Sequence, residues 1–180
     1  LRWSVEKRID EYNLKPLFNK DALVLDIGSN SGFMANEFAI FCKTVHGVEP
    51  VEELNEIARL VSVRLGVNNT NFFTTKFEDF KNKEVYDVVL SFSSFHTADN
   101  NQITSAEYFF SKVSNYMKKN GLFFYESVSY QKKKEEPDYP FYLAKEEAIS
   151  VCRKKFDILS IKETKSGIEN YETLDLMKKK

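Results

Sequence analysis

The stretch that decides the fold reads Leu23-Val24-Leu25-Asp26-Ile27-Gly28-Ser29-Asn30-Ser31-Gly32, and Phe33-Met34-Ala35 follow it directly. Its first part belongs to an apolar run over 22–27, which is typical of a buried parallel strand. Gly28 lets the backbone turn tightly and lets a ligand approach it, and Gly32 begins the next helix without a side chain in the way. The sequence therefore predicts a strand, a glycine-containing loop and a helix, as in nucleotide-binding α/β domains.

The rest of the chain continues to alternate between short apolar runs and helix-like segments. After a lead-in segment over 1–20, with a helix over 1–18, strands are expected over 22–27, 44–49, 71–75, 85–92, 122–128, 156–163 and 171–177. Helices are expected over 33–41, 51–65, 103–117 and 141–155, and Asn120-Gly121 is expected to end the third of these. This alternation predicts an α/β fold with a doubly wound, mostly parallel sheet, whose ligand crevice lies at the carboxyl ends of the strands.

The helix expected over 51–65 is amphipathic. Its apolar face follows the i, i+3, i+4, i+7 spacing and comprises Leu54, Ile57, Ala58, Val61 and Leu65.

Length and composition set the outer limits of the molecule. The chain has 180 residues, which suits one domain over 1–180, and 42% of them are hydrophobic. The 26 Lys and Arg against 27 Asp and Glu argue against a broad nucleic-acid surface. No apolar run approaches the roughly 18 residues that span a membrane, and no signal peptide is visible, so we expect a cytoplasmic protein. Cys42 and Cys152 are expected to be buried thiols, and no metal site is expected.

Two carboxylates indicate the kind of ligand. Glu49 ends the strand after the glycine loop, where a carboxylate can accept hydrogen bonds from both hydroxyls of a ribose. Asp26 precedes the first glycine, and a carboxylate there repels a diphosphate but attracts an ammonium group. A dinucleotide-binding GxGxxG pattern from Gly28 would also need glycines where the chain has Asn30 and Phe33. The site therefore favours a nucleoside with a cationic tail over a nicotinamide dinucleotide.

Together with Glu49, the motifs Phe77-Glu78-Asp79 and Tyr86-Asp87-Val88-Val89-Leu90 give the chain a recognisable pattern. Over nearly its whole length it resembles the class I S-adenosylmethionine-dependent methyltransferases. The resemblance implies a Rossmann-like, seven-stranded sheet with its last strand antiparallel. Asn30 stands where a middle glycine is usual in the family, and asparagine tolerates the left-handed backbone conformation.

The resemblance also implies where S-adenosylmethionine would bind. Its methionine part would be lined by Asp26, Gly28, Ser29, Asn30 and Gly32, and its sulfonium would be bordered by Ser91 and Phe92. Its ribose would be held by Glu49. Its adenine would lie against Pro50 and Val51, with its edge near Phe77, Glu78 and Asp79. The alternative for Glu78 and Asp79 is a solvated acidic turn.

The acceptor side is expected to lie after the strand over 85–92. His96 follows it, and the ordinary pKa of histidine, about 6.5, suits a general base at neutral pH. The alternative is a histidine that only packs in the loop. Glu126 and Ser127 end the next strand on the same side, and the polar stretch over 129–140 could fold over the acceptor as a lid.

These observations favour an enzyme that moves the methyl group of S-adenosylmethionine to a small-molecule acceptor, with S-adenosylhomocysteine as the second product. A hydroxyl oxygen of a sugar or another biosynthetic metabolite fits best, because no Asn-Pro-Pro-Tyr or Asp-Pro-Pro-Tyr run follows the fourth strand. The alternatives are a nucleic-acid methyltransferase with a basic stripe around 132–134, and a subunit that binds S-adenosylmethionine without turnover. The sequence leaves the oligomeric state open.

Overall fold

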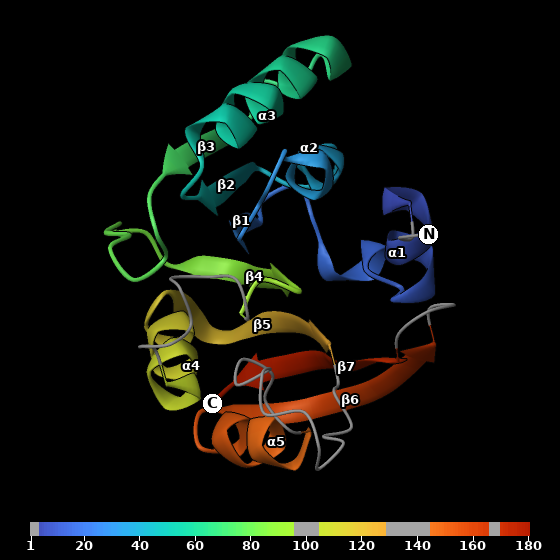
Figure 1. Ribbon diagram of the computed structural model, residues 1–180, viewed down its shortest axis with the longest axis vertical. Helices are drawn as coiled ribbons and strands as arrows, with labels where there is room; N and C mark the ends of the chain where they lie inside the picture. The colour runs from blue at the N-terminus through green and yellow to red at the C-terminus, as the bar shows by residue number, and fades with distance from the viewer. Residues whose placement is uncertain (1–3, 96–104, 129–144, 166–169) are drawn as a thin grey trace, which may run out of the picture.

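The computed structural model describes residues 4–95, 105–128, 145–165 and 170–180, and a central sheet organises them (Figure 1). Its strands are β1 (Leu23–Ile27), β2 (Thr44–Glu49), β3 (Thr70–Thr74), β4 (Tyr86–Phe92), β5 (Met117–Val128), β6 (Phe156–Lys165) and β7 (Asn170–Lys179). The helices are α1 (Val5–Glu11), the short 3-10 helix η1 (Lys15–Leu17), α2 (Phe33–Ala39), α3 (Glu52–Leu65), α4 (Ala106–Asn115) and α5 (Lys145–Arg153).

The sheet has seven strands in the order β3-β2-β1-β4-β5-β7-β6. Strands β1 to β5 pair in parallel, and β7 is inserted antiparallel between β5 and β6. This confirms the doubly wound, mostly parallel sheet with its last strand antiparallel. The strand order reverses between β1 and β4, so the carboxyl ends of these two strands form the topological switch point where ligands bind in such sheets.

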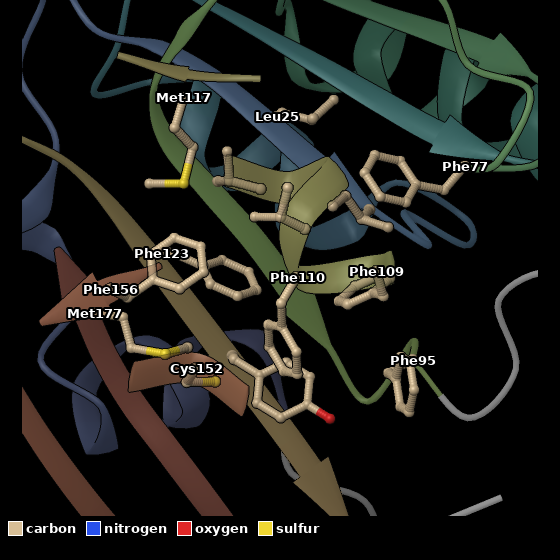
Figure 2. Close-up of a cluster of buried hydrophobic side chains, with 14 of the residues drawn as sticks. Leu25, Phe77, Phe95, Phe109, Phe110, Met117, Phe123, Cys152, Phe156 and Met177 are labelled. Carbon is tan, nitrogen blue, oxygen red and sulfur yellow. The ribbon is translucent and has the colours of Figure 1, made fainter. Parts of the chain in front are cut away.

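Successive strand residues point to opposite faces of the sheet and so build two hydrophobic cores. Leu25 of β1 and Phe123 of β5 face α4 and α5 (Figure 2), whereas Val24 and Phe124 face α1 and α2. The two cysteines divide between these cores as buried free thiols, as expected from the sequence, and burial raises their pKa to about 11 for Cys42 and about 12 for Cys152.

Two helix boundaries differ from the expectation. The lead-in helix is short, because α1 ends at Glu11 and Asn13 adopts a left-handed φ of 50° before η1. The helix expected over 103–117 ends at Asn115, and Met117 already pairs with Tyr86 in the sheet. Asn120-Gly121 therefore lies inside β5 and does not end a helix. In the described parts of the chain, no helix is long and apolar enough to cross a membrane.

Helix α3 buries only part of the apolar face that the sequence suggests: Ala58 is buried and Leu54 and Val61 are half-buried. Its buried residues are Asn55, Ala58 and Ser62, whereas Ile57 and Leu65 are exposed. The reason is the close approach of α3 to the glycine loop, since a Cβ atom added at Gly32 would lie 2.5 Å from the Cβ of Ala58. Only small or hydrogen-bonding side chains fit at this contact.

Candidate cofactor and acceptor site

The glycine loop between β1 and α2 holds three residues in the left-handed backbone region. The φ angles are 69° at Gly28, 50° at Asn30 and 70° at Gly32. Asn30 thus adopts the left-handed backbone conformation that asparagine tolerates. The backbone N–H groups of Gly28 and Ser29 both donate to the Val48 carbonyl, at 2.8 and 3.1 Å, and so fasten the loop to the end of β2.

Glu49 is held in place beside this loop. Its Oε2 accepts from the Asn30 N–H at 3.1 Å and its Oε1 from the Val51 N–H at 3.2 Å. The backbone carbonyl of Glu49 accepts from the Asn55 side chain at 2.8 Å. The side chain is therefore positioned by both the loop and the start of α3, and carboxylate oxygens can each accept more than one hydrogen bond.

Asp26 carries a buried oxygen atom without a hydrogen-bond partner among the described residues. Its side chain is 2% exposed, and the atom in question is Oδ2. Burial, and to a lesser degree the negative charge of Glu49, raise the pKa of this carboxyl to about 7. The hydroxyl of Ser29 is likewise buried without a described partner. Two orphaned polar groups beside one loop indicate a place where a ligand supplies the missing partners.

The other residues expected near the cofactor have different surroundings. Ser91 is buried at the end of β4, and its hydroxyl lies 2.7 Å from that of Ser94. Phe92 packs between Phe38 and Phe124 on the α2 side of the sheet.

The turn over 77–79 presents only part of its side chains. Phe77 lies in the core against Phe109, with ring centroids 5.5 Å apart, whereas Glu78 is half-buried and Asp79 is exposed, as is Pro50. The Phe77 side chain is therefore part of the core, whereas the side chains of Glu78 and Asp79 are accessible at the turn. Contacts of all these residues with S-adenosylmethionine stay predictions. His96 and the segment 129–140 lie outside the described residues.

Ser94 is a site residue that the sequence reading did not single out. A Cβ atom added at Gly28 would lie 2.4 Å from the Cβ of Ser94, so the loop after β4 rests directly on the glycine loop. No local pattern reveals this contact, because it depends on the parallel pairing of β1 with β4.

A buried carboxylate lies at the end of β5 and is contacted by three other side chains. Glu126 is 1% exposed and receives the Tyr12 hydroxyl at 2.8 Å, the Ser93 hydroxyl at 2.6 Å and the Arg8 guanidinium at 3.2 Å. Its backbone carbonyl accepts from the Ser93 N–H at 2.9 Å, and Ser93 has a left-handed φ of 52°. Glu126 therefore ties α1 to the loop that carries Ser94.

A family model described as a methyltransferase domain matches residues 18–172. The chain belongs to the class I S-adenosylmethionine-dependent methyltransferases. No curated protein matches this methyltransferase in a sequence search.

Solved structures of other methyltransferases share the fold. N-methyltransferase NodS from Bradyrhizobium japonicum WM9, in complex with S-adenosyl-L-homocysteine, is 13% identical with a TM-score of 0.78, and the match covers 97% of this chain and 86% of NodS. An S-adenosylmethionine-dependent methyltransferase from Clostridium acetobutylicum ATCC 824 is 14% identical with a TM-score of 0.71, covering 97% of this chain and 88% of that one.

The residues of this methyltransferase fit its cofactor, S-adenosylmethionine. The buried Asp26, whose Oδ2 has no partner in the described parts of the chain, suits the ammonium group of the methionine part, because a cation offsets the cost of burying the carboxylate. The fixed carboxylate of Glu49 suits the two ribose hydroxyls. When bound, the cofactor supplies a methyl group on a positively charged sulfur, which is reactive towards nucleophiles.

Glu126→Gln is expected to destabilise the methyltransferase by about 1–3 kcal/mol, because it removes the charge that Arg8 and two hydroxyls face. The melting temperature should fall by several degrees, and amides of α1 should exchange faster with deuterium. Glu107→Gln is the matched control. Its ion pair with Lys154 is exposed on both sides, so the change should be below about 0.5 kcal/mol. Equal melting shifts in the two variants would contradict the proposed anchoring of α1.

Proposed function

We propose that this methyltransferase transfers a methyl group to a hydroxyl oxygen of a small metabolite, such as a sugar or another biosynthetic intermediate. The observation that supports the proposal is the cluster of hydroxyl groups and a carboxylate at the carboxyl ends of β4 and β5. Ser93 is half-buried, and Ser91, Ser94 and Glu126 are buried beside it. The serine hydroxyls can donate to and accept from the hydroxyl groups of such a metabolite, and the carboxylate can accept from them. The formal net charge of −1 further favours a small acceptor over a nucleic acid.

Different residues of the chain bind the cofactor, orient the acceptor and remove its proton. Asp26 binds the ammonium group and Glu49 the ribose of the cofactor, while the residues at the ends of β4 and β5 orient the acceptor oxygen towards the methyl group. As the new C–O bond forms and the S–C bond breaks, the hydroxyl proton must leave. We assign its removal to His96, in keeping with the position of this residue directly after the loop 93–95.

The proposal is tested by incubating the purified protein with methyl-labelled S-adenosylmethionine and panels of sugars, hydroxylated metabolites, amines and RNA. We expect S-adenosylhomocysteine to form only with hydroxylated small molecules, and NMR of the product should show an O-methyl group. Amines are included in the panel because NodS is by name an N-methyltransferase. Methylation confined to amines would overturn the proposal that the acceptor atom is an oxygen. Methylation confined to RNA, or cofactor binding without any turnover, would overturn the small-molecule function.

In the same assay His96→Asn should lower kcat about a hundredfold or more while leaving the Kd for the cofactor nearly unchanged. Normal cofactor binding together with turnover at the full rate would remove His96 as the base.

A further inference from the structure

Helix α3 carries an apolar ridge on the side turned away from the sheet. Ile57, Leu60 and Val63 follow one another at i, i+3 spacing and are 43%, 69% and 79% exposed. The opposite side of α3 already packs through Ala58 and Ser62. In Figure 1 the helix lies along the outer edge of the molecule, above α2 and beside the terminal strand β3.

The hydrogen bonds beneath α3 show that its orientation is well determined. Asn36 of α2 donates to the Ala58 carbonyl at 3.1 Å, and the Ser62 hydroxyl donates to Asn36 at 2.6 Å and lies 3.0 Å from the hydroxyl of Thr70 in β3. Rotating the helix to bury Leu60 and Val63 would break these buried hydrogen bonds. The ridge is therefore a fixed feature of the surface.

The sequence of α3 is complementary to itself about Leu60. If a second copy packs antiparallel with a twofold axis at this residue, Ile57 lies opposite Val63 of the second copy, and Glu56 lies opposite its Arg64. An interface about a twofold axis contains each such pair twice. Apolar contact at the centre and opposite charges on both flanks are the features that stabilise an antiparallel helix pair.

We propose that the exposed face of α3 is a self-association surface, through which two copies of the methyltransferase form an antiparallel helix pair centred on Leu60. The contact area of one short helix per copy makes this a weak, concentration-dependent dimer. Because Leu60 lies about 12 Å along the helix from its start near Glu49, the pairing leaves the two cofactor sites at opposite ends of the interface. Cofactor affinity should therefore not depend on it.

The test is sedimentation equilibrium of the full chain, saturated with S-adenosylhomocysteine, over a roughly hundredfold range of protein concentration. We expect a monomer–dimer equilibrium whose dissociation constant rises about tenfold or more in Leu60→Asp. Ile161→Asp is the control, since Ile161 is also an exposed apolar residue but lies on β6, and the equilibrium of this variant should match that of the parent. A parent that stays monomeric throughout, or a Leu60→Asp variant that dimerises normally, would overturn the proposal.

Charge reversal provides a second and sharper readout. Glu56→Arg and Arg64→Glu should each weaken the dimer about tenfold, because each places like charges opposite one another in both copies. The double variant should return to within about threefold of the parent, since it restores both pairs with their signs exchanged. Circular dichroism and S-adenosylhomocysteine affinity should be unchanged in all four α3 variants. A double variant no better than the single ones would rule out the antiparallel pairing.

Discussion

Replacing Glu49 with alanine is expected to weaken the binding of S-adenosylmethionine about a hundredfold or more. Two hydrogen bonds from ribose hydroxyls to a carboxylate are lost, and bonds to charged groups contribute about 1.5–3 kcal/mol each. The loss is compounded at the loop, because Glu49 also accepts the Asn30 and Val51 N–H groups. Isothermal titration with S-adenosylmethionine and S-adenosylhomocysteine measures the effect for both ligands.

Two further variants distinguish the loss of the Glu49 carboxylate from the loss of a nearby charge and from a change in side-chain shape. Glu53→Ala removes an exposed carboxylate near the start of α3 and should leave the affinity unchanged. Glu49→Gln keeps the shape of the side chain and should bind more tightly than Glu49→Ala but less tightly than the parent. If Glu49→Ala binds both ligands within threefold of the parent, Glu49 does not hold the ribose.

Asp26→Asn is expected to stabilise the ligand-free protein increasingly as the pH rises. The pKa of Asp26 is about 7 in the folded protein, above its ordinary value of 3.8, so the folded state binds the proton more tightly than the unfolded chain. The stability linked to this proton is fully present below about pH 4 and is lost as the pH rises through 7. Asparagine stays neutral, so its stability relative to the parent should increase by about 2 kcal/mol between pH 5.5 and pH 8.

Thermal unfolding of both proteins across this range tests the stability change. A constant difference between them would show that Asp26 does not titrate as the structure indicates. Binding of S-adenosylmethionine gives an independent readout, because pairing with the ammonium group requires the ionised carboxylate. The parent should bind more tightly as the pH approaches 7, with release of a proton near pH 6. Asp26→Asn should bind weakly at every pH and release none.

The parts of the fold and of the candidate site that the sequence predicts are those set by short stretches of the chain or by the pairing of parallel strands. The strand runs and the turn at Gly28 are local, and the meeting of Asp26 and Glu49 follows because neighbouring parallel strands end at the same edge of a sheet. The partners of Glu126 could not be predicted in this way. Tyr12 lies 114 residues away along the chain, and only the docking of α1 brings the two side chains together.

The buried face of α3 was predicted only in part, because Ala58 belongs to the expected apolar face but the buried Asn55 and Ser62 do not. Periodicity finds the most apolar side of a helix, which includes Ile57 and Leu65. The contact with the glycine loop selects instead for small size at Ala58 and for hydrogen bonding at Ser62. Where a backbone approaches closely, space decides which face is buried, and hydrophobicity is secondary.

The position of β7 between β5 and β6 has a consequence for how the molecule is made. The chain is synthesised from its N-terminus, so β1 to β5 with their helices are available before β7. Strand β6 pairs only with β7, so it gains its place in the sheet when residues 170–179 have been synthesised and the β6–β7 hairpin docks as a unit. Until then the outer edge of β5 offers unpaired backbone groups, and the newly made chain is most prone to aggregate during this interval.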